Sequence, residues 1–270
     1  WNQWHSHPDV LIGLVLLEGT YLFAVGVLRK RFGHDERIDP KQTAVFTSGI
    51  LVILLSLLSP LHHLSNEYLF SAHMLQHVLL TLVAPPLLVL GTPGWIIREV
   101  TKPHRLLAIA KVLTHPVVAF LLFNVSFSLW HIPALYNLSV TNHGWHIFEH
   151  VLFMSTAILL WWPITSTVAE LPRLSYPLRI LYIFLVSIAQ IIVFAPITFA
   201  TEPLYEWYTH APRIIPLTAV ADQQIGAIIM KVGGGAFLMG VLIVAFFRWY
   251  NDEENRSPAE FTKVGYETEV

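Results

Sequence analysis

Seven long apolar stretches constrain the fold of this chain more than any other feature of its sequence. Each is close to the roughly 20 residues that an α-helix needs to cross the hydrocarbon core of a bilayer. Only 13% of the 270 residues are charged, about half the share of an ordinary soluble domain, so a soluble enzyme is excluded. The sequence therefore predicts an all-α polytopic membrane protein, a bundle of seven transmembrane helices. The stretches cover residues of about 10–28, 43–61, 69–90, 116–133, 145–163, 177–199 and 224–247.

The connections between these stretches are short, and turn-forming residues such as Pro40, Pro60 and Pro172 lie in them. No connection has room for a folded soluble domain, so we expect a single transmembrane domain over residues 1–250. Residues 251–270 are polar and net acidic, which predicts a cytoplasmic tail. The chain begins with Trp1 rather than Met, so we expect that further residues precede it.

The distribution of basic residues predicts the orientation. Fourteen of the 16 Lys and Arg lie in the first, third and fifth connections and the C-terminal segment. The N-terminal segment and the second, fourth and sixth connections hold only Arg213. Loops rich in Lys and Arg stay in the cytoplasm, so we expect the N-terminus outside and the C-terminus inside. Eleven of the 14 histidines then lie toward the outer side, and only His34, His104 and His115 lie toward the cytoplasm.

The outer ends of three predicted helices carry histidines at a similar depth. His73 and His77 are four residues apart and share one face of the third helix, with Met74 beside them. Two imidazoles at this spacing can hold one metal ion, and a polar group at bilayer depth usually marks a functional site. Further histidines of the same cluster end the fourth helix or begin the fifth: His131, His146 and His150.

The chain contains no Cys, which excludes disulfides, iron–sulfur clusters and thiolate-based metal sites. Imidazole with thioether ligands suits copper, particularly Cu(I), and zinc stays open as an alternative. Haem fits less well, because tandem histidine pairs are more compact than a porphyrin site. We interpret His5, His7 and His210 as interfacial side chains. The predicted metal ligands are drawn from His73, His77, Met74, His131, His146, His150 and Met230.

Several motifs in these helices carry a resemblance to a known family. They are His73-Met74-Leu75-Gln76-His77, Pro85-Pro86-Leu87-Leu88-Val89-Leu90-Gly91-Thr92-Pro93, Trp130-His131-Ile132-Pro133-Ala134-Leu135-Tyr136, His146 through His150 ahead of Trp161-Trp162-Pro163, and Asp222-Gln223-Gln224 with Gly226 and Met230. Together they resemble the CtaG-type cytochrome c oxidase assembly factors of bacteria, over about residues 10–250. Lys231 departs from the pattern, since an aromatic residue is expected there.

The resemblance implies an assembly factor, not an enzyme, for a caa-type haem-copper oxidase in the bacterial plasma membrane. Such a factor would bind copper on the outer side and aid its insertion at the CuB centre. The implied partners are the large subunit of cytochrome c oxidase, the lipid bilayer and a copper donor chaperone, with a homo-oligomer open. With a net charge of -2, no nucleic acid is expected as a partner.

Two other function classes remain open from the sequence. A membrane redox enzyme would use haem or copper to exchange electrons with quinone. A copper or proton transporter would use Asp222, Lys231 and Gln190 as pathway residues. A zinc-dependent hydrolase fits less well, because the sequence has no HExxH motif and no paired carboxylate in its helices.

Overall fold

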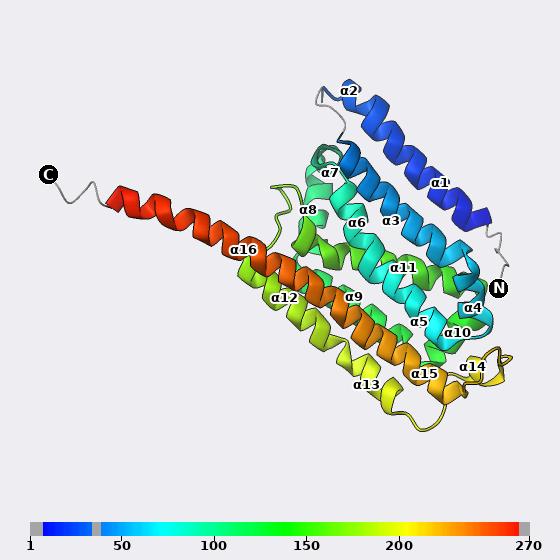
Figure 1. Ribbon diagram of the computed structural model, residues 1–270. Helices are drawn as coiled ribbons and strands as arrows, with labels where there is room; N and C mark the ends of the chain where they lie inside the picture. The colour runs from blue at the N-terminus through cyan, green and yellow to red at the C-terminus, as the bar shows by residue number, and fades with distance from the viewer. Residues whose placement is uncertain (1–7, 34–38, 265–270) are drawn as a thin grey trace.

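The computed structural model describes residues 8–33 and 39–264, with side chains described as far as residue 255. The described part is entirely helical (Figure 1) and contains no strand. Six helices are long and apolar enough to cross a membrane, which confirms the predicted helical membrane bundle. They are Pro8–Arg31, Pro40–Leu58, Phe70–Gly91, His143–Thr165, Tyr176–Phe199 and Ala219–Asn255.

Several of these spans are interrupted by a short π-helical segment or by a break. The span elements are α1 (Pro8–Phe23), η1 (Ala24–Leu28), α2 (Arg29–Arg31), α3 (Pro40–Leu58), α5 (Phe70–Val78), η2 (Leu79–Val83), α6 (Ala84–Gly91), α11 (His143–Thr165), α12 (Tyr176–Ala189), α13 (Ile191–Phe199), α15 (Ala219–Ile228), η3 (Ile229–Gly233) and α16 (Gly234–Val264). The connecting elements are α4 (Pro60–Glu67), α7 (Gly94–Thr101), α8 (His104–Leu113), α10 (Pro133–Thr141) and α14 (Glu206–His210).

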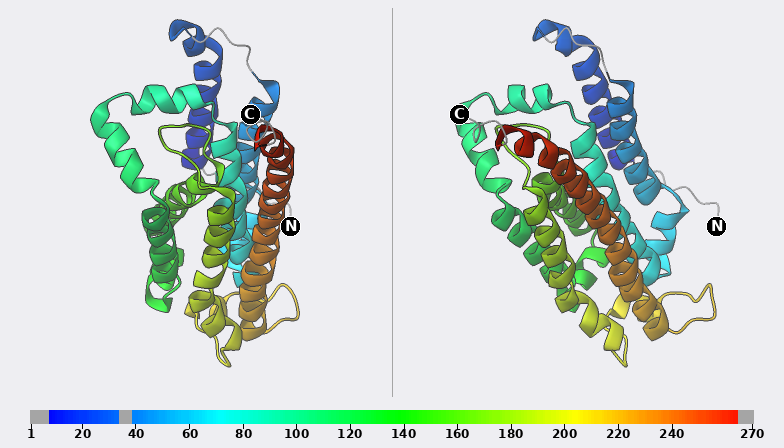
Figure 2. Two further views of the ribbon diagram at one scale, coloured as in Figure 1. Left: turned by 90° about the vertical axis from the view of Figure 1, so that its left-hand side faces the viewer. Right: turned by 60° about the vertical axis from the view of Figure 1, so that its left-hand side comes forward.

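The fourth predicted span, over residues 116–133, differs from the others. It forms α9 (Pro116–Trp130), which has only 15 residues and reaches the length of a span only if α8 is counted with it. The two helices are bent by 64°. Pro116 explains the bend, because a residue before proline is forced out of the helical conformation, and His115 is extended at φ -61° and ψ 131°. Figure 2 shows α7 and α8 turning away from the bundle before α9 returns along it.

The span formed by α5, η2 and α6 lies inside the bundle. In its most apolar 18 residues, 67% are buried, against 22% in the corresponding stretches of the first and last spans. It packs against α3, α11 and α15, so its side chains meet protein on most sides instead of lipid. The helix that carries His73 and His77 is therefore the central one, and polar side chains on it must find partners within the protein.

Two glycines allow neighbouring helices to approach this central span closely. A Cβ on Gly91 would lie 2.4 Å from the backbone nitrogen of Phe46, so α6 and α3 touch through their backbones. A Cβ on Gly226 would lie 2.5 Å from the ring of Phe70, where α15 meets α5. Both glycines belong to the motifs noted above, and close packing gives a physical reason for each.

The segment expected to be a polar tail begins within α16, which stays helical to Val264. Figure 1 shows this helix projecting well beyond the rest of the bundle.

Candidate metal centre

The start of α5 is fixed by a carboxylate from another helix. Leu69 precedes α5 and offers no capping side chain, but Asp222 of α15 is fully buried beside the free amides of its first turn. The carboxylate accepts hydrogen bonds from the backbone nitrogen of Phe70 at 2.7 Å and from that of Ser71 at 3.3 Å. The Ser71 hydroxyl also donates to it at 2.5 Å. These bonds satisfy amides that a helix start leaves open and set the position of the histidines that follow.

His73 and His77 lie one turn apart on α5, with ring centroids separated by 4.4 Å. Neither residue has any exposed surface. None of their four ring nitrogens makes a hydrogen bond to any described residue. Burying a polar group without a partner is unfavourable, and native proteins leave few such groups. Four buried ring nitrogens without hydrogen bonds in one place are what a metal-binding pair would show.

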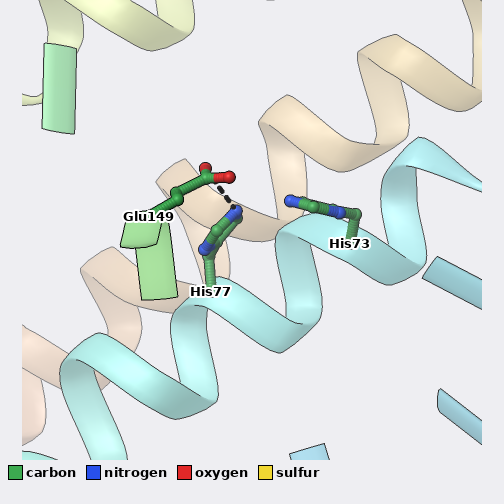
Figure 3. A group of neighbouring side chains, drawn as sticks. All are labelled: His73, His77 and Glu149. Carbon is green, nitrogen blue, oxygen red and sulfur yellow. Dashed lines mark ion pairs between the residues drawn. The ribbon is translucent and has the colours of Figure 1, made fainter. Parts of the chain in front are cut away.

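A carboxylate from α11 completes this group (Figure 3). Glu149 is 1% exposed, and its Oε1 atom lies 3.5 Å from Nε2 of His77. The Ser139 hydroxyl of α10 donates to its other oxygen, Oε2. One ligand atom each from His73, His77 and Glu149 lies within 4.8 Å of the other two. Small rotations of the side chains would allow all three to contact one ion, because metal–ligand bonds of about 2.0–2.2 Å separate neighbouring ligand atoms by roughly 3–4 Å.

The other predicted histidine ligands surround this group. The ring of His131 lies 6.0 Å from that of His77, and the ring of His146 lies 5.8 Å from that of His73. The ring of His150 lies 5.7 Å from that of His77. His131 also shows a feature of metal ligands: its Nδ1 lies 2.7 Å from the carbonyl of Phe127, so Nδ1 carries the proton and Nε2 presents a lone pair. The structure thus brings all five predicted histidines together.

The two predicted methionine ligands are buried, and both belong to the apolar core around Phe70. Met74 faces α15, since its Cγ would lie 3.0 Å from a Cβ on Gly226. Met230 is 4% exposed, in η3, and belongs with Met74 to the apolar core around Phe70. A role for either sulfur as a soft ligand stays a prediction.

The remaining predicted residues lie elsewhere or outside the described part. His5, His7 and His34 are not among the described residues. His210 is exposed at the end of α14. Lys231 extends to α12, where its Nζ donates to the carbonyl of Ser187 at 2.9 Å. With Asp222 occupied as a cap, two of the three residues assigned to a transporter pathway already make helix–helix contacts.

Sequence reasoning missed Glu149, although a signal for it exists. It is the only Asp, Glu, Lys or Arg between residues 145 and 163, and a charged side chain in such a stretch usually has a specific role. Its spacing of three residues from His146 places it on the same side of the helix as that histidine, so it could have been included with it.

His62 was also missed, and it has a different role. Its Nδ1 lies 3.0 Å from Nε2 of Gln76, and its Nε2 lies 3.1 Å from the side-chain amide of Asn66. Gln76 in turn donates to the carbonyl of Ser56 at 2.9 Å and accepts from the Ser65 hydroxyl at 3.0 Å. Nδ1 of His62 therefore joins α4 to α5, while its Nε2 is bonded within α4.

Three buried tyrosines lie at one end of the cluster, and the ring of Tyr136 is 5.4 Å from that of His73. The Tyr208 hydroxyl donates to the carbonyl of Ser65 at 2.6 Å, and the Tyr136 hydroxyl donates to that of Tyr208 at 3.2 Å. The Tyr205 hydroxyl donates to the carbonyl of His131 at 2.9 Å. Burial raises the pKa of Tyr136 and Tyr208 above that of an exposed phenol. Both tyrosines are therefore neutral at pH 7, and they exclude water from the site without adding charge.

These features define a class: a helical membrane protein with a buried histidine–carboxylate site near one end of its bundle. The family model of the cytochrome c oxidase caa3 assembly factor, Caa3_CtaG, matches residues 19–252, and the chain belongs to this family. The match confirms the resemblance drawn from the motifs. The family is described as an assembly factor of cytochrome c oxidase.

The relatives come from mycobacteria. The uncharacterized protein Mb0105 of Mycobacterium bovis is 32% identical over 133 residues, which are 44% of this chain and 20% of the relative. The uncharacterized protein ML1998 of Mycobacterium leprae is 25% identical over 257 residues, 89% of this chain and 39% of the relative. The chain thus spans less than half the length of these relatives. No solved structure matches it.

Proposed function

We propose that this protein binds copper as its cargo at His73, His77 and Glu149 and passes it to cytochrome c oxidase during assembly, at the CuB centre of the large subunit. The observation that carries the proposal is the pair of fully buried histidines whose four ring nitrogens have no hydrogen-bond partner among the described residues. Imidazole and carboxylate ligands suit copper and zinc alike. We favour copper because the oxidase that such a factor serves contains it.

Release of the cargo requires a route from the site to the partner. A groove of about 340 Å³ between α9 and α13 is lined by His131 together with Leu129, Pro196 and Tyr205. Because His131 lines the groove and its ring lies 6.0 Å from that of His77, it connects the buried pair to the surface of the bundle. Transfer would proceed by ligand exchange, in which histidines of the oxidase replace those of the carrier one at a time.

The site would face the outer side of the bacterial plasma membrane. The excess of Lys and Arg in alternate connections supports this orientation, with the N-terminus outside and the C-terminus in the cytoplasm. Single cysteines at Asn66 and Asn142 should then react with a membrane-impermeant reagent in intact cells, whereas one at Lys111 should react only after lysis. The reverse pattern would contradict the proposed side of delivery.

Three further partners belong to this proposal. The lipid bilayer surrounds the spans, a copper donor chaperone loads the site, and a second copy of the chain is a candidate for a homo-oligomer. Mass of the purified protein in lipid nanodiscs, measured with and without copper, tests the last of these directly.

The central experiment separates the amount of oxidase from its activity. In a strain that carries the His73→Ala and His77→Ala substitutions, oxidase subunits should accumulate while oxidase activity and copper content fall severalfold. Added copper should restore part of the activity, because a higher concentration can replace a carrier. A strain with His104→Ala and His115→Ala provides the matched control. Full activity and full oxidase copper in the first strain, under copper limitation, would refute the proposal.

A further inference from the structure

We propose that His146 and His150 form a second, shallower metal position through which the ion enters the buried site. This inference rests on the proposed function and extends it from one binding position to two. It starts from the number of ligands in the cluster. One ion of the kind proposed takes about four ligands, whereas the cluster offers five histidines and one carboxylate. The group of His73, His77 and Glu149 leaves three histidines around it.

The second pair repeats the geometry of the first. His146 and His150 are four residues apart on α11, and their ring centroids are separated by 4.4 Å, the same value as for His73 and His77. An ion bound at about 2.0–2.1 Å from two imidazole nitrogens places the ring centroids roughly 5 Å apart, so either pair needs only a small adjustment to hold one. Nε2 of His150 has no hydrogen-bond partner among the described residues.

The two pairs are close enough for an ion to pass between them. The rings of His73 and His146 lie 5.8 Å apart, and those of His77 and His150 lie 5.7 Å apart. Both distances allow an ion to be held by one ring from each pair during the exchange. No large movement of a helix is needed for such a transfer.

The pairs differ in their access to the surface. His146 is 8% exposed and His150 is 7% exposed, whereas His73 and His77 are 0% exposed. The ring nitrogens of His146 and Nε2 of His150 are themselves covered, so a small side-chain rotation would open the α11 pair to an arriving ion before the α5 pair. Glu149 supplies one negative charge for the whole cluster, so a second cation should bind roughly tenfold more weakly, or weaker still, because of repulsion at this short range.

The test is a titration of the purified full-length protein with Cu(I) against a chromophoric chelator, without oxygen. The native protein should bind two ions with separable affinities. His146→Ala with His150→Ala should remove the weaker ion, keep the tighter one and slow its loading at least severalfold. His73→Ala with His77→Ala should remove the tighter ion and keep the weaker. His104→Ala with His115→Ala, on α8 and before α9, should match the native protein.

The outcomes separate this inference from the proposed function. A single ion in the native protein, lost in both double variants, would mean one shared site and would overturn the second position alone. No bound ion in the native protein would overturn the proposed function as well. If an alanine variant fails to purify as a single species, the corresponding glutamine variants, which keep volume and polarity, replace it in the same titration.

Discussion

Two buried polar clusters lie side by side on α5 and differ in how far their hydrogen bonds are completed. In the cluster of His62, Gln76 and Ser65, the side chains bond to one another and to the backbone at 3.0 Å or less. In the cluster of His73 and His77, all four ring nitrogens lack such partners. Both clusters are buried in the same part of the bundle, so burial alone does not distinguish them. What distinguishes them is whether the protein itself supplies the partners.

This difference assigns the two clusters different roles. A completed network stabilises the fold, and removing one member leaves the others unpaired. An incomplete cluster destabilises the fold until a ligand arrives, so the presence of such a cluster in a folded protein indicates ligand binding.

The largest effect is expected on metal binding when the incomplete cluster is removed. His73→Ala with His77→Ala should abolish tight copper binding, because the remaining ligands of that position reduce to one carboxylate. The melting temperature of the metal-free protein should change little, since the loss of unpartnered polar atoms offsets the loss of packing. Elemental analysis and differential scanning fluorimetry measure the two effects. A large loss of stability without a change in metal content would reverse the assignment.

Glu149→Gln is expected to have the next largest effect on binding. It keeps the shape of the side chain and an acceptor for Ser139, but removes the charge that offsets the cation. We expect copper affinity to fall roughly 10- to 100-fold, the range seen when groups around a metal are altered. Competition with a chelator measures this directly, and Glu99→Gln, in α7, serves as the control. Unchanged affinity would remove Glu149 from the site.

The completed cluster should respond in the opposite way. Gln76→Ala would remove one hydrogen bond each from His62, Ser65 and the carbonyl of Ser56, and we expect it to destabilise the protein by about 1–3 kcal/mol. Copper stoichiometry should stay that of the native protein. Thermal unfolding in detergent, followed by circular dichroism, measures the loss of stability, and elemental analysis measures the copper stoichiometry. Loss of copper at unchanged stability would show that the network belongs to the metal site.

Much of the fold follows from the sequence because membrane spans are governed by length and polarity. Six of the seven predicted stretches match helices of sufficient length, since each must satisfy its own backbone in lipid. The fourth is shorter because Pro133 forces Ile132 out of the helical conformation, so α9 ends at Trp130 by a local rule that hydropathy does not contain.

The site was predictable in part for a similar reason. Helical spacing placed His73 with His77 and His146 with His150, because both members of each pair lie on one helix. Contacts between helices were beyond this reasoning. The approach of Glu149 to His77 and the cap from Asp222 to α5 depend on packing between segments distant in sequence.

The smallest predicted effect tests how the cap at α5 supports the site. Asp222→Asn keeps the size of the side chain and an acceptor oxygen but removes the charge opposite the amides of Phe70 and Ser71. Losing a helix cap costs about 1 kcal/mol, and asparagine replaces much of it, so stability should fall only slightly. Because His73 follows this turn directly, copper affinity should fall a few-fold without a change in stoichiometry. A parallel titration of Gln224→Glu, on the same helix, controls for charge near α15. If Asp222→Asn removed the ion altogether while the protein stayed folded, Asp222 would be a metal ligand instead of a helix cap. It would then belong with the side chains that bind the ion and not with those that position α5.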